Sequence, residues 1–301
     1  MPHPLPSSVL VTGARGNIGH KIVAALADAS WCRRIVALDL MASPESIPSV
    51  GAEKVSAVTG DLTRATAPWT EAFAGVDACI HLAAQNPDVN ATWSEAAHSF
   101  DMTINVGMAA VRHGVRRLVF ASSNHVMGGY KDAPLSTGLQ PGGLTTDLPP
   151  SPGTKWHDGT TFQDSTRYAT AKLMGERLVT GLGLQSEGAL TGVSVRIGWA
   201  QPGENLARTI SHAGSVIGGM PEAKDEVSRR DLRWFRNMWL SNADLAGLFL
   251  AAVTANSGAW PAPGIVVNGM SANRDMDWDM SGATQWLGYQ PQDDLYTQIS
   301  G

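Results

Sequence analysis

Apolar runs and helical stretches alternate along most of the chain. The first run, 9–11, leads into a glycine-rich turn, after which apolar residues recur at 18, 22, 23 and 26 with helical spacing. Further strands are expected at 35–38, 55–58, 78–82, 117–121, 193–197 and 265–267, and further helices at 69–73, 92–113, 166–182 and 242–253. Strands that alternate with helices predict an α/β fold built on a doubly wound parallel sheet.

Two stretches interrupt this alternation. Residues 131–165 are rich in proline and glycine, so we expect an irregular loop there without a regular element. The charged stretch 218–236 is also expected to be irregular. A long loop inside a compact domain usually has a function, because ordering it costs conformational entropy. Both stretches are therefore candidates for a role in binding.

A glycine-rich turn follows the first expected strand. Residues 12–19 read TGARGNIG. Gly13 permits a tight turn, Gly16 permits the backbone to approach a pyrophosphate, and Gly19 permits close packing of the next helix. Because strand, turn and helix occur in the order that this motif requires, the pattern predicts a dinucleotide site on a Rossmann fold. The residues of the turn assigned to the cofactor are Gly13, Arg15, Gly16, Asn17, Ile18 and Gly19.

An acidic residue, Asp39, ends the second expected strand, 20 positions after Gly19. Its carboxylate is suited to accept hydrogen bonds from the adenosine ribose hydroxyls and would repel a 2′-phosphate at the same place. The pattern therefore predicts NAD rather than NADP as the cofactor. Arg15 supports the alternative, because a guanidinium in the turn could pair with a 2′-phosphate.

Residues after the third and fourth strands extend the predicted cofactor site. Asp61 and Leu62 follow the third strand, where the carboxylate of Asp61 is placed to meet the adenine edge. On the nicotinamide ribose side, the residues after the fourth strand are Leu82, Ala83 and Ala84. His81 precedes them, and a hydrogen-bonded core histidine is at least as good an interpretation of it as a binding role.

Tyr168 and Lys172 lie four residues apart on one face of the helix expected over 166–182. A nearby ammonium favours the phenolate, so Lys172 is expected to lower the pKa of Tyr168 toward a value useful for proton abstraction. Ser123 closes the fifth strand, and the carboxyl ends of Rossmann strands face the bound nicotinamide. These three residues are therefore the predicted catalytic set.

The chain resembles the extended short-chain dehydrogenases over nearly its whole length. The shared motifs are TGARGNIG at 12–19, GDLT at 60–63, HLAA at 81–84, Asn105, and YATAK at 168–172. The resemblance implies that Tyr168 is the general base, that Lys172 modulates its pKa and binds ribose, and that Ser123 polarises the reacting oxygen. It also implies that Asn105 supports the site, with a buried packing role as the alternative.

Within that superfamily, FASSNHVMGGY at 120–130 is similar to the uronate dehydrogenases, which oxidise the anomeric carbon of galacturonate or glucuronate to an aldarolactone. The similarity implies that Ser123, Asn124 and His125 contact the sugar. It also implies that Arg208 binds the substrate carboxylate, as a guanidinium can do with two hydrogen bonds. A solvated helix arginine is the alternative for Arg208.

The chain departs from the uronate dehydrogenases near the substrate. Ser123 and Tyr168 lie 45 residues apart, so the loop at 131–165 is largely an insertion, and a second one occupies about 209–236. Both leave from elements beside the substrate, and we therefore expect a reshaped or more deeply covered pocket.

One tryptophan and one asparagine also differ from the residues of the uronate dehydrogenases near the substrate. Asn86 and Trp199 stand where that group carries small hydroxyl residues near the sugar, so both are assigned to substrate binding. Trp199, Trp234 and Trp239 could stack on a sugar ring or belong to the core.

These residues predict an NAD-dependent oxidoreductase that transfers a hydride from C1 of a sugar or uronate-like sugar acid to NAD, giving a lactone. A nucleotide-sugar epimerase or dehydratase, with the same fold and catalytic set, is the second hypothesis. It ranks second because the chain has few basic residues for a diphosphate apart from Arg208 and the pair Arg229 and Arg230. A non-catalytic NAD sensor ranks last, because it would have little use for an intact catalytic set.

Composition and length exclude several partners. The 301 residues carry 22 Lys and Arg against 27 Asp and Glu, so neither nucleic acid nor a membrane surface is expected to bind. Cys32 and Cys79 are expected to be core thiols, and no metal site is expected. No apolar run reaches transmembrane length, so a cytoplasmic protein is expected. The helices at 92–113 and 166–182 are the expected contact of a homo-oligomer.

The patterns also divide the chain. Residues 1–190 are expected to form the NAD-binding Rossmann domain, which contains the inserted loop 131–165. Residues 191–301 are expected to supply the remaining strands of the sheet and a small C-terminal substrate-binding lobe.

Overall fold

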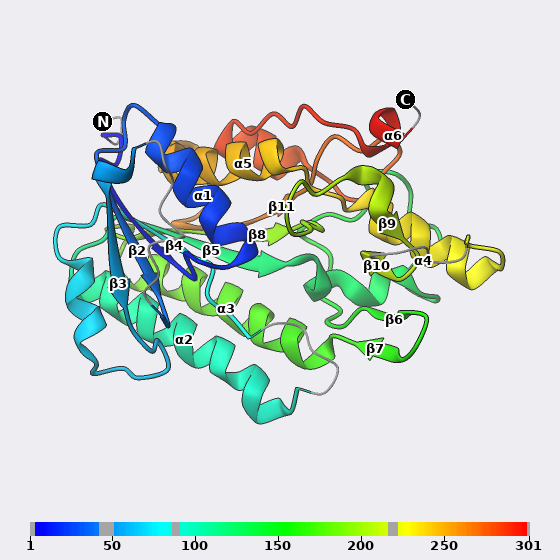
Figure 1. Ribbon diagram of the computed structural model, residues 1–301, viewed down its shortest axis with the longest axis horizontal. Helices are drawn as coiled ribbons and strands as arrows, with labels where there is room; N and C mark the ends of the chain where they lie inside the picture. Colours follow the sequence, from blue (N-terminus) through cyan, green and yellow to red (C-terminus); the bar gives the residue numbers. More distant parts are fainter. Residues whose placement is uncertain (1–3, 42–50, 86–90, 216–221, 300–301) are drawn as a thin grey trace.

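Seven parallel strands form one central sheet in the computed structural model, which describes residues 4–41, 51–85, 91–215 and 222–299 (Figure 1). The strands are β1 (Ser8–Thr12), β2 (Arg34–Asp39), β3 (Val55–Thr59), β4 (Ala78–His81), β5 (Arg117–Ser123), β8 (Thr191–Ile197) and β11 (Gly264–Gly269). Each coincides with an expected apolar run, so the predicted doubly wound α/β fold is confirmed.

The order of the strands creates a crevice at one end of the sheet. It runs β11-β8-β5-β4-β1-β2-β3, so successive strands move outward in opposite directions from the neighbours β1 and β4. At such a switch point the loops after the two strands separate, and ligands bind outside the carboxyl ends.

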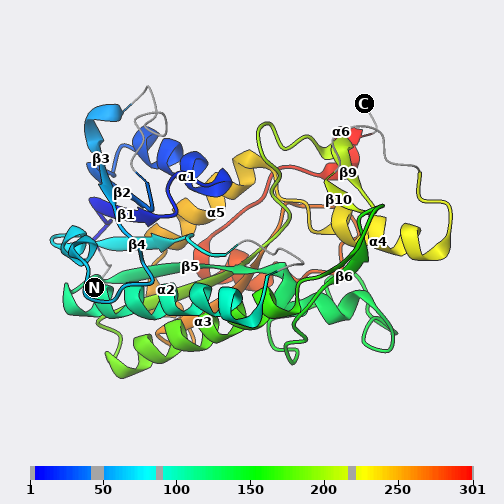
Figure 2. The ribbon, with the colours of Figure 1, turned by 60° about the horizontal axis from the view of Figure 1, so that its bottom comes forward.

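Helices cover both faces of the sheet (Figures 1 and 2). One face is covered by α1 (Asn17–Asp28) and α5 (Asn242–Thr254), and the other by α2 (Trp93–Arg112) and α3 (Thr166–Gln185). Each pair of helices packs on the sheet through its own apolar cluster. Along β1, Val9 and Val11 pack with the first cluster and Leu10 with the second. Burial on both faces explains why the strands read as continuous apolar runs.

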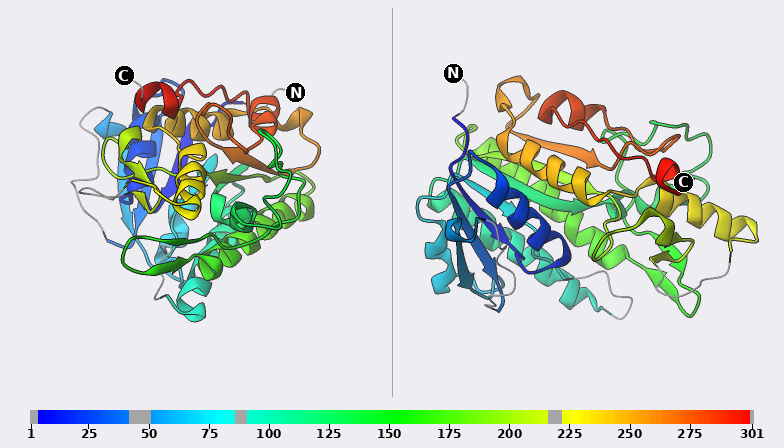
Figure 3. Two further views of the ribbon diagram at one scale, coloured as in Figure 1. Left: turned by 90° about the vertical axis from the view of Figure 1, so that its right-hand side faces the viewer. Right: turned by 45° about the horizontal axis from the view of Figure 1, so that its top comes forward.

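A smaller lobe continues from the carboxyl ends of β5 and β8 (Figures 1 and 3). Its elements are η4 (Asn124–Lys131), β6 (Lys155–His157), β7 (Phe162–Asp164), η5 (Ala207–Thr209), β9 (Ile210–Ser211), β10 (Gly214–Ser215), α4 (Glu226–Asn237) and α6 (Leu295–Ile299). Its apolar core joins Val126 and Trp156 to Phe235 and Trp239. The lobe therefore draws on residues before 190 as well as on the C-terminal third.

Both stretches that were expected to be irregular contain regular elements. Within 131–165, β6 and β7 pair as an antiparallel hairpin, and the Asp158 carboxylate accepts hydrogen bonds from two backbone amides in its turn. Within 218–236, α4 begins at a capping box formed by Asp225 and Ser228. In the first stretch the last proline is Pro152, so the residues after it are free to form a hairpin. In the second stretch most charged residues lie on the exposed face of an amphipathic helix, which is why the charges do not prevent a regular element.

Short helical turns complete the described chain: η2 (Ala52–Lys54), η3 (Pro68–Phe73), η6 (Ser257–Ala259) and the π-helical turn η7 (Ala283–Leu287). Cys32 and Cys79 are buried and free, as expected of core thiols. Among the described helices, none combines the length and the apolar character needed to cross a membrane.

Candidate active site

The glycine-rich turn packs tightly between β1, α1 and the end of β4. Gly13 has a φ of +66°, and a Cβ there would lie 2.7 Å from the amide nitrogen of Ala83. A Cβ on Gly19 would lie 2.0 Å from the carbonyl oxygen of Gly13, so only glycine lets α1 start directly against the turn. Gly16 differs, because a Cβ there would meet a single atom, at 3.3 Å. Open space beside Gly16 fits the predicted approach of a pyrophosphate.

The first turn of α1 leaves its backbone amides available for a ligand. Its N-cap, Gly16, has no side chain, and the turn contains no acidic residue. Asn17 donates a hydrogen bond to the carbonyl of Ala200 (2.9 Å), which ties the turn to the segment after β8, while Ile18 packs on the apolar core. Uncapped amides at the positive end of a helix dipole suit the phosphates of a dinucleotide.

The Asp39 carboxylate lies beside this turn at the end of β2. It accepts hydrogen bonds from the amides of Arg15 (2.9 Å) and Leu40 (2.7 Å), which leaves lone pairs on both oxygens for ribose hydroxyls. The Arg15 guanidinium donates to the carbonyl of Met41 (3.2 Å). Asp39 therefore lies where a carboxylate would receive a free ribose and repel a 2′-phosphate, which fits NAD.

The loop after β3 is held by two local contacts. The Asp61 carboxylate accepts from the hydroxyl (2.6 Å) and the amide (3.0 Å) of Thr63, and these hydrogen bonds lower the pKa of Asp61. Leu62 is buried, and its carbonyl accepts from the side-chain amide of Asn105 (2.8 Å). Asn105 thus holds the loop from α2, and its role in supporting the site stays a prediction.

His81 is a core histidine. It is fully buried, its Nδ1 lies 2.7 Å from the hydroxyl of Thr12, and its ring stacks on Phe120. Burial lowers its pKa to about 3. The amide of Ala83 also donates to the Thr12 hydroxyl (3.3 Å), so the segment Leu82, Ala83 and Ala84 is held against β1 at the switch point.

The predicted catalytic residues converge beside this point. Ser123 is the last residue of β5, while Tyr168 and Lys172 project from the first two turns of α3. The Tyr168 hydroxyl is hydrogen-bonded to Ser123. The ammonium of Lys172 donates to the carbonyl of Ala121 (2.6 Å) and lies 5.6 Å from the centre of the Tyr168 ring.

The pKa values of this pair differ from the sequence-based expectation. Burial raises the pKa of Tyr168 to about 12, although the hydrogen bond with Ser123 opposes the change. Burial also lowers the pKa of Lys172 to about 7. Lys172 was expected to lower the pKa of Tyr168 by its charge, but desolvation weakens that charge and dominates both groups in the protein alone.

His125 lies against Tyr168 inside a group of aromatic rings. Its ring is stacked nearly parallel on Trp156, with centroids 5.8 Å apart, and meets Tyr168 (6.1 Å) and Trp199 (6.2 Å) edge-on. Phe235 closes the group with edge contacts to Trp156 (5.7 Å) and Trp199 (4.9 Å). We call His125, Trp156, Trp199 and Phe235 the aromatic cluster.

Asn124 places an unpaired acceptor next to this cluster. Its side-chain amide donates to the carbonyl of Ile197 (3.0 Å), which identifies the other atom as the oxygen. That oxygen, Oδ1, is buried and accepts no hydrogen bond from a described residue. A hydroxyl group from a substrate would satisfy it.

The sequence analysis missed two features of the site: the contact of Trp156 with Phe235, and the ion pair of Glu176 with Arg196. Trp156 and Phe235 come from the two insertions, and only the fold brings them together. Glu176 forms a bidentate ion pair with Arg196 (2.9 Å to each carboxylate oxygen) and accepts from the hydroxyl of Ser122 (2.6 Å). The second feature could have been found, because Glu176 follows Lys172 by one helical turn on the same face of α3.

The remaining predicted substrate residues are not all brought to Tyr168. Arg208 is exposed on η5 and makes no hydrogen bond or ion pair with another residue of the described ranges. Trp234 and Trp239 are buried core residues, at 4% and 1% exposure, whereas Trp199 is half-buried beside His125. Asn86 lies outside the described residues.

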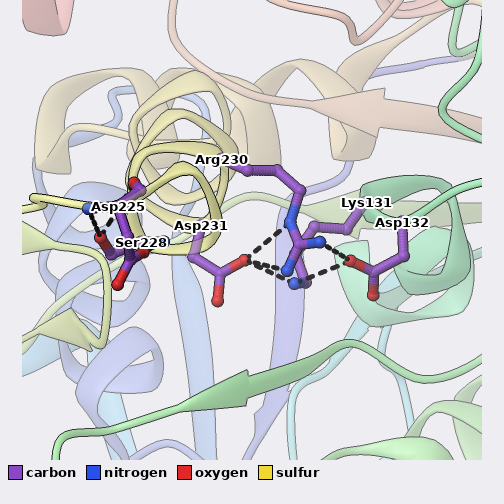
Figure 4. A network of polar contacts seen from close by, with 6 residues as sticks. All are labelled: Lys131, Asp132, Asp225, Ser228, Arg230 and Asp231. Carbon is purple, nitrogen blue, oxygen red and sulfur yellow. Dashed lines mark hydrogen bonds and ion pairs between the residues drawn. The ribbon is translucent and has the colours of Figure 1, made fainter.

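An ion-pair network ties the first insertion to α4 (Figure 4). Lys131 pairs with Asp231 (2.6 Å) and Asp132 (3.2 Å), and Arg230 pairs with the same two carboxylates (2.9 Å each). A cavity of about 150 Å³ adjoins the network, and Trp234 and Arg230 line it, whereas Ser123, Tyr168 and Lys172 do not. Within the described chain, no group of three or more His, Cys, Asp or Glu side chains is arranged to hold a metal ion.

Comparison with known proteins identifies the family. The model of the NAD dependent epimerase/dehydratase family matches residues 9–200, and the chain belongs to this family. NAD is therefore the cofactor, as the glycine-rich turn predicts, and the resemblance to extended short-chain dehydrogenases is confirmed.

Two relatives that match over nearly their whole length are sugar dehydrogenases. The chain is 29% identical to an L-arabinose 1-dehydrogenase (NAD(P)(+)) of Haloferax volcanii over 97% of this chain and 98% of that protein. It is 32% identical to an NAD-dependent glucose-6-phosphate dehydrogenase of the same organism, over 95% and 93% respectively. A solved structure of a mutated uronate dehydrogenase aligns with a TM-score of 0.67 and 25% identity, over 98% of this chain and 85% of that one.

Proposed function

We propose that this member of the NAD dependent epimerase/dehydratase family oxidises C1 of a free sugar or sugar acid to a lactone. The observation that carries the proposal is the convergence of Ser123, Tyr168 and Lys172 at the switch point of the sheet, with Tyr168 hydrogen-bonded to Ser123. The sugar dehydrogenases among its relatives support the direction of the chemistry.

In the reaction, the C1–H bond and the O–H bond at C1 break and a C=O bond forms. NAD⁺ supplies the acceptor for the hydride. Ser123 donates a hydrogen bond to the reacting oxygen, and Tyr168 in its phenolate form takes the hydroxyl proton. Lys172 lies behind the Tyr168 ring, where its ammonium form would stabilise the phenolate and its neutral form could accept a proton.

An assay of NAD⁺ reduction tests this function. The purified protein is supplied with NAD⁺ and with free aldoses, uronates or sugar phosphates, and NADH is followed by absorbance. We expect NADH in amounts equal to the lactone formed. A nucleotide-sugar epimerase would instead convert its substrate without net reduction of added NAD⁺, and that result would contradict the proposal.

The variant Tyr168→Phe tests the assignment of the base. It keeps the ring and its contact with His125 and removes only the hydroxyl, so kcat should fall by about 100-fold or more while NADH affinity stays nearly unchanged. Turnover close to that of the wild type would remove Tyr168 from the mechanism.

We also propose that the protein is a cytoplasmic homo-oligomer that pairs through α2 and α3. The outer surfaces of these helices expose Met108, Val111, Met174 and Leu184, whose apolar side chains a partner subunit would bury. Light scattering would show a dimer or larger species, and Met174→Asp with Leu184→Asp should shift the mass to that of one chain.

A further inference from the structure

The first insertion lies directly against the start of η4. The amide of Gly153 donates a hydrogen bond to the carbonyl of His125 (2.9 Å), and the amide of Ser151 donates to the carbonyl of Val126 (3.1 Å). These backbone contacts join two segments that are more than 20 positions apart in the chain. They fix the next residue of the insertion, Thr154, in position relative to the His125 ring.

Thr154 is held on its other side by Ser165, the residue before α3. The Thr154 amide donates to the Ser165 hydroxyl (2.9 Å), and the Thr154 carbonyl accepts from the amide of Ser165 (3.1 Å). The Thr154 side chain is fully buried, and its hydroxyl lies 2.8 Å from Nδ1 of His125. Within the described chain, this is the one hydrogen bond that the Thr154 hydroxyl makes.

This contact decides which nitrogen of His125 carries the proton. Burial lowers the pKa of His125 to about 4, so near pH 7 the ring is neutral, with one donor and one acceptor nitrogen. If Nδ1 carried the proton, Thr154 would accept it and its own hydroxyl proton would be buried without an acceptor. If Thr154 donates to Nδ1, only a lone pair on its oxygen is left unused, which costs less than an unpaired donor. The second arrangement is therefore favoured, with the proton on Nε2.

The other ring nitrogen of His125 is available to a ligand. Nε2 makes no hydrogen bond with a described residue, and it retains some exposure, whereas Oδ1 of Asn124 is fully enclosed. The ring meets Tyr168 edge-on, with centroids 6.1 Å apart. Trp156, which follows Thr154 by two positions, is stacked on the same ring at an interplanar angle of 6° and restricts its tilt. A protonated Nε2 is thus an oriented donor next to the candidate base.

We propose that Thr154 is a positioning residue whose hydroxyl holds His125 in its Nε2–H tautomer, so that His125 donates a hydrogen bond to an oxygen of the bound sugar. The inference rests on the proposed function and adds a residue to its site. Thr154 acts through His125 alone, because its hydroxyl has no other recorded partner in the described chain.

Nitrogen-15 NMR of histidine-labelled protein tests the tautomer without substrate or turnover. The chain has eight histidines, and the variant His125→Phe identifies the signals of His125 by their loss. We expect Nδ1 of His125 in the range of an unprotonated nitrogen and Nε2 in the range of a protonated one. In Thr154→Val the Nδ1 signal should move toward that of a nitrogen without a hydrogen bond. A protonated Nδ1 in the wild type overturns the inference and leaves the proposed function standing.

Kinetics test the consequence for the reaction. With the free aldose or uronate that gives the highest kcat/KM in the assay of NAD⁺ reduction, Thr154→Val should lower kcat/KM by about 5-fold or more, because the donor is no longer enforced. The Kd of NADH should stay within about 2-fold, since no hydrogen bond of Thr154 reaches the cofactor turn. Thr154→Ser keeps the hydroxyl and should retain kcat/KM within about 2-fold of the wild type.

Thr70→Val is the matched control. Thr70 is a buried threonine of η3 whose hydroxyl donates to the carbonyl of Ala67, so the variant loses a comparable hydrogen bond away from His125. It should keep the wild-type kcat/KM. An equal loss in Thr70→Val, or an equal loss in Thr154→Ser and Thr154→Val, would reduce Thr154 to a structural role and overturn the inference.

A double-mutant cycle shows whether Thr154 acts through His125. His125→Phe keeps a ring for the stack on Trp156 and removes both nitrogens. Adding Thr154→Val to it should change kcat/KM by less than about 2-fold, because no imidazole remains to be held. Losses that multiply would show an independent effect of Thr154 and overturn the inference. NAD⁺ reduction by none of the sugars contradicts the proposed function instead, and the NMR signals of His125 then still decide its tautomer.

Discussion

The substitution Lys172→Met should stabilise the fold and abolish activity. Lys172 is 2% exposed, and burial lowers its pKa from 10.5 to about 7. In the described chain its ammonium has no carboxylate partner, and it contacts the carbonyl of Ala121 and the faces of the Phe120 and Tyr168 rings. Methionine has a similar shape without the charge, so it removes the desolvation penalty and the group that acts on Tyr168.

The magnitude follows from the gap between the two pKa values. Each pKa unit corresponds to about 1.4 kcal/mol, so lowering the pKa from 10.5 to about 7 corresponds to a penalty on the order of 4 kcal/mol at neutral pH. Loss of the hydrogen bond to Ala121 and of the contact with Phe120 offsets about 1 to 2 kcal/mol of the gain. We therefore expect the variant to be more stable by about 2 to 3 kcal/mol at pH 7.

Because folding lowers the pKa of Lys172, the sign of the pH dependence of stability is fixed. Between pH 7 and 10.5 the unfolded chain binds a proton at Lys172 and the folded chain does not, so wild-type stability rises with pH in this window. The advantage of Lys172→Met is therefore greatest at and below about pH 7 and disappears as the pH approaches 10.5. Other titrating groups are common to both proteins and cancel in the difference.

Urea unfolding of the two proteins without added NAD, at pH values from 6 to 10, measures this difference. Tyr168→Phe serves as a control, because the pKa of Tyr168 rises from 10.0 in the unfolded chain to about 12 in the fold, so its phenol changes the pH dependence only near pH 10. In parallel, kcat/KM of Lys172→Met should fall by about 100-fold or more. A variant that is less stable at pH 7, or a stability difference that is the same at pH 6 and pH 10, would refute the reasoning.

Three further substitutions test other parts of the site. Asp39→Ala should weaken NAD binding and relax discrimination against NADP, because it deletes both the ribose acceptor and the repulsion of a 2′-phosphate; Kd values for the two cofactors measure this. Arg208→Met should change kcat/KM for neutral aldoses by less than about 2-fold, whereas a loss of about 10- to 100-fold confined to uronates would assign Arg208 to a substrate carboxylate. Glu176→Gln should cost about 3 to 5 kcal/mol in the free energy of unfolding, measured with urea, because it leaves the Arg196 guanidinium buried without a counter-charge.

The sheet and the cofactor turn could be predicted because their signals are local. Each strand is a short apolar run, and the glycine at position 19 is required by contacts with Gly13 and Ala14 of the same turn. The ion pairs and aromatic contacts of the lobe could not be predicted in this way. Trp156 and Phe235 are 79 positions apart, and no periodicity in either insertion indicates that their rings meet.

The pKa values of Tyr168 and Lys172, the candidate catalytic pair, depend on a pattern in the sequence that the tyrosine-lysine motif alone does not include. Ala169, Lys172, Glu176 and Val179 follow the spacing of one helical face, and all four are buried on α3. A buried lysine or glutamate on a core-facing stripe should either form an ion pair or have its pKa shifted toward the neutral form. Glu176 forms an ion pair with Arg196. Lys172 has no charged partner and contacts a carbonyl and aromatic rings, so the pKa of Lys172 falls. The tyrosine-lysine motif alone therefore does not fix the charges of the two groups, because burial here raises the pKa of Tyr168 and lowers that of Lys172.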